Sequence, residues 1–345
     1  MKILYGVVGE GMGHATRSRV VIEHLLSRGH ELKVVVSGRA HGLLVRSFAG
    51  RERIDIDEIQ GLFMRYEGNA LDVGRSVLAN LGKAPASLAR NIAAYVRLDF
   101  EPDAIVSDFE SWAFFYGLNH DKPVISIDNM QVINRCEHPE EITRDPDFQL
   151  AKAAVKVKLP GAHHYIVTTF FRPPVRKERT TLVPPILRPE ILAARREPGK
   201  HVLVYQTAAA NEALVPLLQS LPYEFRLYGM RRDAVLGNVI LRDFSETGFV
   251  DDLRTARAVI AGGGFSLMGE AVHLRVPMYS VPIEGHYEQI LNARYLAMLG
   301  YGRHGESFER DAIADFLDNA PSDTGYEPRD NSELFESVDK VLATV

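Results

Sequence analysis

The chain has 345 residues, with 40 Lys and Arg against 45 Asp and Glu, so its formal net charge is −5. Hydrophobic residues make up 46% and charged residues 25%, as in an ordinary globular protein. The acidic balance argues against a dedicated nucleic-acid-binding protein, because such proteins usually have a basic domain. The single cysteine, Cys136, excludes an internal disulfide and a thiolate cluster for zinc, and it fits a reducing compartment. At roughly 150 residues per domain, the length predicts two domains.

Membrane-spanning and export segments are not indicated by the sequence. The first eight residues are mostly apolar, but Gly9 and Glu10 end that run, and a signal peptide needs a longer one. A spanning helix needs about 20 consecutive apolar residues, and we find no such run. We therefore expect a cytoplasmic protein, for which a peripheral contact with the inner face of the membrane stays open.

Short apolar runs alternate with helical patterns along the chain, which is typical of buried parallel strands between helices. In the first half, strands are predicted over residues 3–8, 31–36, 104–107, 124–127 and 165–168. A helix is predicted over residues 16–29, with Val20 and Leu25 in one apolar stripe and Gly29 at its end. The second half repeats the pattern, with strands over 201–205, 224–228, 258–260 and 278–281 and helices over 212–220, 266–273 and 286–299. Two such series predict an α/β protein with two doubly wound parallel sheets.

A proline-rich stretch separates the two series. Six prolines fall between residues 171 and 198 without a clear helical or strand period: Pro173, Pro174, Pro184, Pro185, Pro189 and Pro198. Because proline removes a backbone donor and fixes φ, this stretch suits an interdomain connection. We place the hinge near residues 183–189, which gives domains of 1–183 and 184–345. The segment after Phe335 is expected to return to the first domain.

The first predicted strand runs into a glycine-rich segment, residues 9–17, with the sequence GEGMGHATR. Glycines permit a sharp turn and let a ligand approach a helix N-terminus, where free N–H groups favour negative charge. The glycine spacing does not fit the dinucleotide fingerprint, and His14 and Ala15 stand where a P-loop needs Lys and Ser or Thr. The alternative to a ligand-binding segment is a glycine turn that serves only close packing.

His14 and Asp108 are the candidate catalytic pair. A histidine that follows a strand at the edge of a sheet can act as a general base near neutral pH. Asp108 follows the strand predicted over 104–107, and ligands of open α/β sheets bind outside the carboxyl ends of the strands. Asp108 is therefore expected to lie near His14 and to hold its tautomer. The alternatives are a capping role for His14 and an N-cap role for Asp108 in the next helix.

The most specific pattern of the second half follows the strand predicted over 258–260. Residues 261–271, with the sequence AGGGFSLMGEA, form a glycine turn and a new helix N-terminus, which together can seat a diphosphate. Glu270 lies one turn into that helix, within reach of paired ribose hydroxyls. Glu288 and Gln289 begin the next predicted helix and are placed to read sugar hydroxyls.

These segments resemble the donor site of GT-B glycosyltransferases, and most closely the MurG-type N-acetylglucosaminyltransferases and their relatives of unassigned substrate. The loop that ends in Gly13 and His14 is similar to the N-terminal glycine loop of that group, and residues 183–188 (VPPILR) are similar to its interdomain segment. The resemblance covers nearly the whole chain. It implies the GT-B fold, in which two Rossmann-like domains face an interdomain cleft, with the acceptor on the first domain and the nucleotide-sugar donor on the second.

The resemblance also implies roles for individual residues. Glu270 would hold the ribose, residues 263–266 the diphosphate and Gln289 the donor sugar, and residues 249–253 match a loop that holds uracil through main-chain atoms. The expected donor-binding residues are Gly13, Thr207, Phe249, Val250, Gly263, Gly264, Phe265, Ser266, Glu270, Glu288 and Gln289. The chain departs from the group at residues 207–211, where TAAAN replaces an expected glycine-rich turn.

The acceptor is expected to be a hydroxyl compound, either a small molecule, a lipid-linked sugar or a polysaccharide. Its candidate contacts are Phe63, Met64 and Tyr66, in a predicted loop before a helix that carries arginines and a lysine. A basic stretch can attract anionic lipid or a phosphate-bearing acceptor, or can simply be a solvated helix face. Its members are Lys152, Lys156, Lys158, Arg172, Arg176, Lys177 and Arg179.

No metal or cofactor is expected beyond the nucleotide-sugar co-substrate. Two D-x-D sequences, residues 55–57 and 145–147, are interpreted as surface or capping residues, because a helix N-terminus can neutralise a diphosphate without a metal.

The combined features predict an inverting glycosyltransferase of the hexosyltransferase type, with UDP as the expected nucleotide. His14 would remove the acceptor proton, and Asp108 would stabilise the imidazolium. The paired glutamates of many retaining GT-B enzymes are absent around Glu270. The alternatives are a nucleotide-sugar epimerase of the same fold, for which the carboxylates are too few, and a non-catalytic nucleotide-sugar-binding protein.

Overall fold

The computed structural model describes residues 1–9, 12–61, 66–67, 70–71, 86, 89–206, 213–243 and 245–345. The chain divides into two compact units. Unit one comprises Met1–Arg65, Val73–Ile186 and Asp330–Val345, and unit two comprises Tyr66–Asp72 and Leu187–Arg329. Among the described residues, no helix is long and apolar enough to cross a bilayer.

Unit one is built, in its described part, on a seven-stranded sheet in which all neighbours are parallel. The order across this sheet is β3 (Ile54–Ile59), β2 (Glu31–Ser37), β1 (Lys2–Val7), β6 (Ala104–Asp108), β7 (Val124–Asp128), β8 (His164–Thr168) and β9 (Thr180–Val183). Every residue of β6 and β7 is buried, as expected for strands covered on both faces. No strand was predicted in the proline-rich stretch, but Thr180–Val183, a run rich in β-branched residues between Pro174 and Pro184, forms β9.

Two of the described helices of unit one begin at a side-chain cap. The labelled helices of this unit are α1 (Met12–Ser27), α2 (Gly38–Ser47), α4 (Ser111–Asn119), α5 (Val132–Arg135), α6 (Glu140–Thr143), α7 (Pro146–Lys158) and α14 (Ser332–Leu342). The Glu110 carboxylate caps α4 by accepting the N–H groups of Trp112 and Ala113, each at 2.7 Å. Asp108 is therefore not the N-cap of this helix, which removes the capping alternative for that residue.

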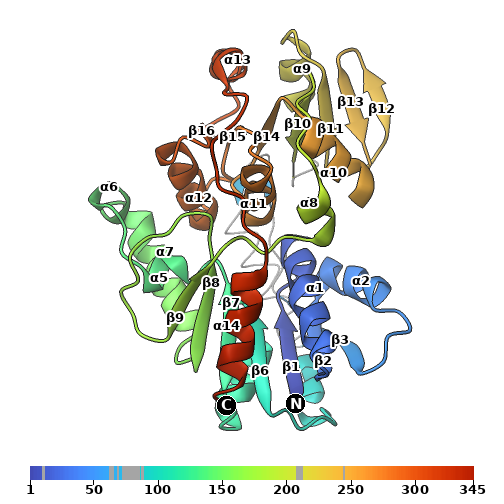
Figure 1. Cartoon of the computed structure of the whole chain (residues 1–345), viewed down its shortest axis with the longest axis vertical. Helices are drawn as coiled ribbons and strands as arrows, with labels where there is room; N and C mark the ends of the chain where they lie inside the picture. The colour runs from blue at the N-terminus through green and yellow to red at the C-terminus, as the bar shows by residue number, and fades with distance from the viewer. Residues whose placement is uncertain are drawn as a thin grey trace. The chain divides into compact units, whose positions relative to one another are not determined.

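The last helix of the chain completes the core of unit one (Figure 1). Leu334, Val338, Val341 and Leu342 of α14 belong to the same apolar cluster as residues of α1 and the central strands. The rings of His24 and Phe335 stack with their centroids 4.2 Å apart. The C-terminal segment is thus part of the N-terminal unit, although unit two lies between them in the sequence.

Unit two has, in its described part, a second seven-stranded sheet. Its order is β12 (Ala234–Leu236), β13 (Val239–Arg242), β11 (Phe225–Tyr228), β10 (Val202–Tyr205), β14 (Ala258–Ala261), β15 (Met278–Ser280) and β16 (Gly302–His304), and only β12 is antiparallel to its neighbour. The helices are α8 (Pro189–Ala193), α9 (Leu214–Gln219), α10 (Glu246–Thr255), α11 (Phe265–His273), α12 (Tyr287–Met298) and α13 (Arg310–Asn319). A small hairpin pairs β4 (Tyr66–Glu67) with β5 (Ala70–Leu71).

Candidate active site

The carboxyl edge of the sheet in unit one brings His14 and Asp108 together. Strands β1 and β6 are parallel neighbours with Val7 opposite Asp108, and the chain passes from β1 into α1, where His14 lies in the first turn. His14 Nδ1 is 2.9 Å from Asp108 Oδ1. The Asp108 side chain is 1% exposed and that of His14 is 24% exposed. The histidine therefore contacts a buried carboxylate while part of its side chain remains open to solvent.

The glycine-rich segment before α1 is described only in part. Gly9 donates its N–H to Ser37 Oγ at 3.0 Å, and a Cβ placed on Gly9 would lie 1.8 Å from the Ser37 carbonyl oxygen. Glycine is therefore required at position 9 for close packing. Gly13 lies in the first turn of α1, whereas Glu10 and Gly11 lie outside the described residues.

Sequence reasoning missed Arg17, which organises this edge of the sheet. Arg17 is buried in α1, three residues after His14, and its Nε donates to Asp108 Oδ2 at 2.9 Å. Arg17 Nη2 contacts Asp108 Oδ1 and lies 2.7 Å from His14 Nδ1, while Nη1 donates to Asn129 Oδ1 at 3.1 Å. Ser18 Oγ also donates to Asp108 Oδ2, at 2.9 Å. The sequence signal that could have indicated Arg17 is its spacing from His14, because residues three apart in a helix share a face.

Two neighbouring carboxyl groups at this edge have opposite electrostatic environments. Burial alone would raise the pKa of Asp108, but the charges of Arg17 and His14 outweigh burial and hold that pKa well below its usual range. Asp128, at the end of β7, is fully buried, and burial raises its pKa to about 6. Asp128 accepts hydrogen bonds from Ser126 Oγ at 2.6 Å and from the Gln131 N–H at 2.9 Å. Near neutral pH, the protein therefore stabilises the ionised form of Asp108, whereas ionised Asp128 destabilises the folded state.

Replacing Asp128 by asparagine is expected to stabilise unit one at neutral pH. The native pKa of Asp128 lies above its ordinary value of 3.8, so the native state loses stability as the pH rises from about 4 through 6. Asparagine keeps the side-chain shape and stays neutral, so the gain above pH 7 should reach about 3 kcal/mol and should vanish near pH 4. Urea unfolding at several pH values measures it. If the difference in unfolding free energy between Asp128→Asn and the wild type does not change with pH, this assignment is contradicted. Asp99→Asn, at an exposed position, serves as the control.

In unit two, the turn between β14 and α11 is locked to the start of α12. A Cβ on Gly263 would lie 2.3 Å from the Gln289 carbonyl oxygen, so only glycine fits there. The Gln289 side-chain oxygen accepts the N–H groups of Gly263 at 3.2 Å and Ile283 at 3.1 Å. Asn292 Nδ2 donates to Gly263 O and to Glu288 Oε1, both at 3.0 Å. The expected donor residues 263, 288 and 289 therefore form one connected group.

The first turn of α11 offers main-chain N–H groups beside this locked turn. Gly264 is the N-cap of α11, and Phe265 and Ser266 are its first residues. Among the described residues, and leaving out the chain neighbours of Gly264, no atom lies within 4 Å of a Cβ placed on this glycine. The amide nitrogen of Gln289 makes no hydrogen bond with the described residues. Main-chain N–H groups at a helix N-terminus are what an anionic ligand binds.

Glu270 is held by Arg188, the second functional candidate that sequence reasoning missed. Arg188 Nε donates to Glu270 Oε1 at 2.8 Å, and Nη2 donates to Oε2 at 3.0 Å. Both side chains are buried, with exposed fractions of 7% and 8%. Burial raises the pKa of Glu270, and Arg188 partly offsets that rise. No spacing rule could have linked two residues 82 positions apart.

The segment expected to hold uracil as a loop is a helix. Phe249 and Val250 lie inside α10 and are buried. The helix starts early because Ser245 Oγ caps it by accepting the Gly248 N–H at 3.1 Å, and the Phe249 N–H then bonds to the Ser245 carbonyl oxygen at 2.9 Å. The main-chain groups of this segment thus take part in the hydrogen bonding of the helix, and the expectation of a loop was wrong.

Several predicted positions cannot be placed. Thr207, Phe63 and Met64 lie outside the described residues, and Tyr66 is described only as part of the backbone of β4.

The two D-x-D sequences are surface and capping residues, as predicted: Asp57 contacts Lys33 Nζ at 2.7 Å, and Asp145 caps α7 by accepting the Asp147 N–H at 3.0 Å. Within the described ranges, no cluster of three His, Cys, Asp or Glu side chains could hold a metal ion.

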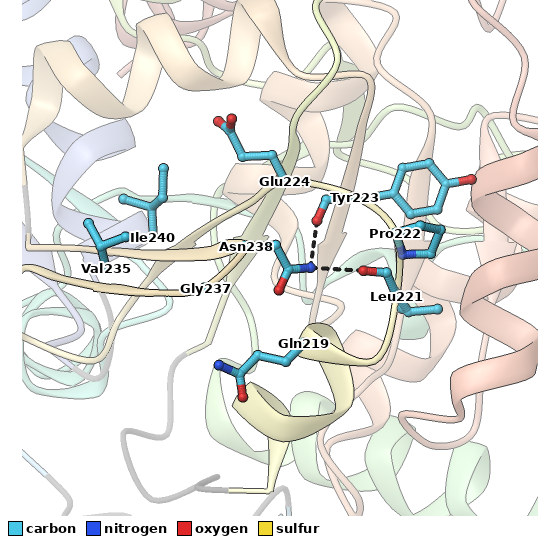
Figure 2. A pocket seen from close by; sticks show the side chains of 9 residues that line it. All are labelled: Gln219, Leu221, Pro222, Tyr223, Glu224, Val235, Gly237, Asn238 and Ile240. Atoms are coloured by element: carbon cyan, nitrogen blue, oxygen red, sulfur yellow. Dashed lines mark hydrogen bonds between the residues drawn. The ribbon is translucent and has the colours of Figure 1, made fainter.

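Figure 2 shows a hollow of about 480 Å³ in unit two. Asn238 closes one side by donating from Nδ2 to the carbonyl oxygens of Leu221 and Tyr223, both at 2.8 Å. Glu224, on its lining, directly precedes β11. The hollow therefore lies at the amino ends of the strands, at the edge of the sheet opposite Gly263 and Glu270, and it is not the candidate donor site.

Comparisons with known proteins agree with this architecture. Residues 1–321 match the family described as glycosyl transferase family 1. An uncharacterized glycosyltransferase of Methanosarcina acetivorans is 26% identical over 329 residues, which cover 88% of this chain and 85% of the relative. Two solved structures share the fold: LpCGTa in complex with UDP, with a TM-score of 0.65, 14% identity and 99% of each chain covered, and MurG of Acinetobacter baumannii, with a TM-score of 0.59, 16% identity and coverage of 100% of this chain and 99% of that one. The chain therefore belongs to glycosyl transferase family 1 and is a glycosyltransferase with the two-domain GT-B fold.

Proposed function

We propose that this glycosyltransferase is an inverting, metal-independent enzyme that moves a hexosyl group from a UDP-linked donor to a hydroxyl acceptor, with His14 as the general base. The observation that carries the proposal is the contact between His14 Nδ1 and the buried, ionised Asp108 carboxylate. Nδ1 lies near both the Asp108 carboxylate, which can only accept, and Arg17 Nη2, which can only donate. In the proposed tautomer, Nδ1 carries its proton toward Asp108, and Nε2 keeps its lone pair for the acceptor hydroxyl.

In this mechanism, the acceptor oxygen attacks the anomeric carbon while its proton passes to His14 Nε2. The bond from the anomeric carbon to the diphosphate oxygen breaks, and the nucleoside diphosphate leaves with that electron pair. Asp108 then stabilises the imidazolium through Nδ1, as in other triads built on a histidine. One attack from the face opposite the leaving group inverts the anomeric configuration.

Arg17 acts in this proposal as a positioning residue. Its bidentate hold on Asp108 fixes the carboxylate against His14, and its charge lies close to the imidazole. A cation at this distance disfavours protonation of the histidine in the resting enzyme. In the proposal, the Asp108 carboxylate thus stays oriented toward His14 when the imidazolium forms.

On unit two, we assign the donor to the carboxyl edge of the sheet. The first turn of α11, at Gly264, Phe265 and Ser266, would bind the diphosphate, because its N–H groups and helix dipole favour negative charge. The amide nitrogen of Gln289 and the Glu288 carboxylate would contact the sugar. LpCGTa, which has the same fold, binds UDP, which supports the choice of nucleotide. Acceptor contacts are proposed at Phe63, Met64 and Tyr66.

The donor class can be tested by thermal shift with a panel of nucleotide sugars and the full chain. A ligand present at 100 times its dissociation constant stabilises a protein by about 2.7 kcal/mol, so the matching UDP-sugar should give the largest shift. Equal shifts for all nucleotides would contradict a UDP-specific site, and no shift with any of them would contradict the donor assignment.

Replacing Glu270 by glutamine is expected to weaken UDP binding roughly 10- to 100-fold, because ribose hydroxyls lose a charged acceptor worth about 1.5–3 kcal/mol. Glutamine is preferred to alanine, since alanine would leave Arg188 buried without a partner. Isothermal titration calorimetry with UDP measures the affinity, and the exposed Glu306→Gln is the matched control. Unchanged affinity in a folded Glu270→Gln protein would remove Glu270 from the donor site.

A further inference from the structure

Four residues of the basic stretch come together around Asn134 in unit one, and we call them the cation cluster: Lys152, Lys156, Arg176 and Lys177. The two lysines of α7 lie one turn apart, and the other two residues lie in the segment that leads to β9. Asn134 belongs to α5, which packs against α7 (Figure 1), and it is 5% exposed. Lys177 Nζ donates to Asn134 Oδ1 at 2.6 Å, and Arg176 Nη2 donates to the Asn134 carbonyl oxygen at 3.0 Å. A buried asparagine thus anchors two neighbouring cations.

The charges of the cation cluster act on one another. Burial lowers the pKa of Lys152, and the charge of Arg176 lowers it further. Burial also lowers the pKa of Lys177, and four cations add to that effect: Arg176, Arg135, Lys156 and Lys152. The charged forms of both lysines are therefore disfavoured by their surroundings.

The cation cluster has no carboxylate partner. None of its four residues forms an ion pair with any residue that the structure describes. Other basic residues of the same region do have partners: Arg144 pairs with Glu140 at 2.6 Å, and Arg172 pairs with Glu333 at 2.7 Å. Even Glu178, which directly follows the cluster in the sequence, is exposed and forms no ion pair with it. The repulsion within the cluster is thus not offset by the described side chains.

The cation cluster also keeps hydrogen-bond donors. Lys152 Nζ makes no hydrogen bond with the described residues, and it lies 5.6 Å from the centroid of the Phe148 ring. Arg176 and Lys177 each use one donor on Asn134, so Nε and Nη1 of the arginine and two N–H groups of the lysine remain. A further donor lies beside Asn134, because the fully buried Gln131 accepts from Asn134 Nδ2 at 3.4 Å while its own Nε2 has no partner.

We propose that the cation cluster binds the phosphate group of a phosphate ester. A phosphate monoester carries a charge of about −1.5 to −2 near pH 7 and has three acceptor oxygens. A single carboxylate brings less charge and fewer oxygens, and several lysine and arginine donors together match the larger anion. A bound phosphate would offset the repulsion within the cluster. The proposal concerns binding to unit one, and it does not depend on the transferase mechanism.

Isothermal titration calorimetry of the full chain with glucose 6-phosphate tests the proposal. Excess UDP is present, so that the ester cannot occupy the candidate donor site. We expect binding of glucose 6-phosphate that weakens as sodium chloride is added, and no binding of glucose. The double variant Arg176→Gln/Lys177→Gln should bind at least about 10-fold more weakly, because charge-assisted hydrogen bonds are lost. The control Arg51→Gln/Lys200→Gln removes two exposed charges elsewhere and should bind like the wild type.

Lys152→Gln is a second variant, for which stability and binding should change in opposite directions. Lys152 makes no hydrogen bond that the substitution would break, and its lowered pKa means that its charge destabilises the folded state. The melting temperature in phosphate-free buffer should therefore rise, while the affinity for glucose 6-phosphate should fall several-fold. Lys200→Gln, at an exposed position, should change neither quantity. A lower melting temperature with unchanged affinity would show a structural lysine and would overturn the proposal.

Three further results would overturn the proposal. The first is wild-type affinity in a folded Arg176→Gln/Lys177→Gln protein, and the second is the absence of any binding of glucose 6-phosphate to the wild type. The third concerns the source of the phosphate. Co-sedimentation with vesicles of phosphatidylglycerol and phosphatidylcholine, together with no response to the soluble ester, would assign the cluster to a lipid surface instead.

Discussion

Replacing His14 by alanine should cut turnover by about 10²–10⁴-fold, the usual contribution of a general base, while donor affinity stays nearly unchanged. His14 contacts Asp108 on unit one, whereas the groups assigned to the donor, apart from Gly13, lie on unit two. Its side chain is 24% exposed, so the substitution should have little effect on folding. Single-turnover rates and calorimetry with UDP, measured on the same protein, separate the two quantities.

The rival interpretation makes His14 a ligand of the diphosphate or a cap of α1. A diphosphate ligand would lose donor affinity when replaced, and a cap would lose stability. Full turnover in the His14→Ala protein would end the proposal.

Asp108→Asn is a second variant that tests the His14–Asp108 pair. It should lower turnover less than His14→Ala does, because the imidazole ring remains. The double variant should lose little more than His14→Ala alone, since the two residues act together. Unlike His14→Ala, Asp108→Asn should also lower the melting temperature, because Arg17 would lose its buried ionic partner.

The buried strands were predictable because their sequences carry the pattern themselves. Strands β6 and β7 are buried throughout and read as short apolar runs. Strand β3 alternates charged and apolar residues, so it has no such run, and it pairs with only one neighbour at the edge of the sheet. The strands β12 and β16 are three residues long and also lie at edges. Their existence depends on the partner strand rather than on their own sequence.

The candidate residues of unit one and those of unit two differ in how far the sequence could define them. Asp108 ends a strand next to the one that leads to His14, and topology alone predicts that they meet. The ionic partners Arg17 and Arg188 were missed, because the partner of a buried charge depends on tertiary packing. Residues 249–253 were interpreted by resemblance, while the local cap at Ser245 made them helical.

Replacing Arg17 by methionine should move the acidic limb of the pH–rate profile to higher pH, by about one unit or more. The base works only when its imidazole is neutral. Two effects of the substitution favour the imidazolium. The cation that lies 2.7 Å from His14 Nδ1 is removed, and the Asp108 carboxylate is no longer neutralised by Arg17. A higher pH is then needed to deprotonate the imidazolium, so the acidic limb of the pH–rate profile moves to higher pH.

Arg17→Lys separates positioning from charge, because lysine keeps the charge but cannot make the bidentate contact with Asp108. We expect it to lower the maximal rate while moving the acidic limb less than Arg17→Met does. It also keeps a cation beside the buried carboxylate if the methionine variant fails to fold. The control is Arg51→Met, which removes an exposed charge from unit one and should leave the profile in place. A purely structural Arg17 would lower the rate equally at every pH in both variants, and that result would remove it from the mechanism.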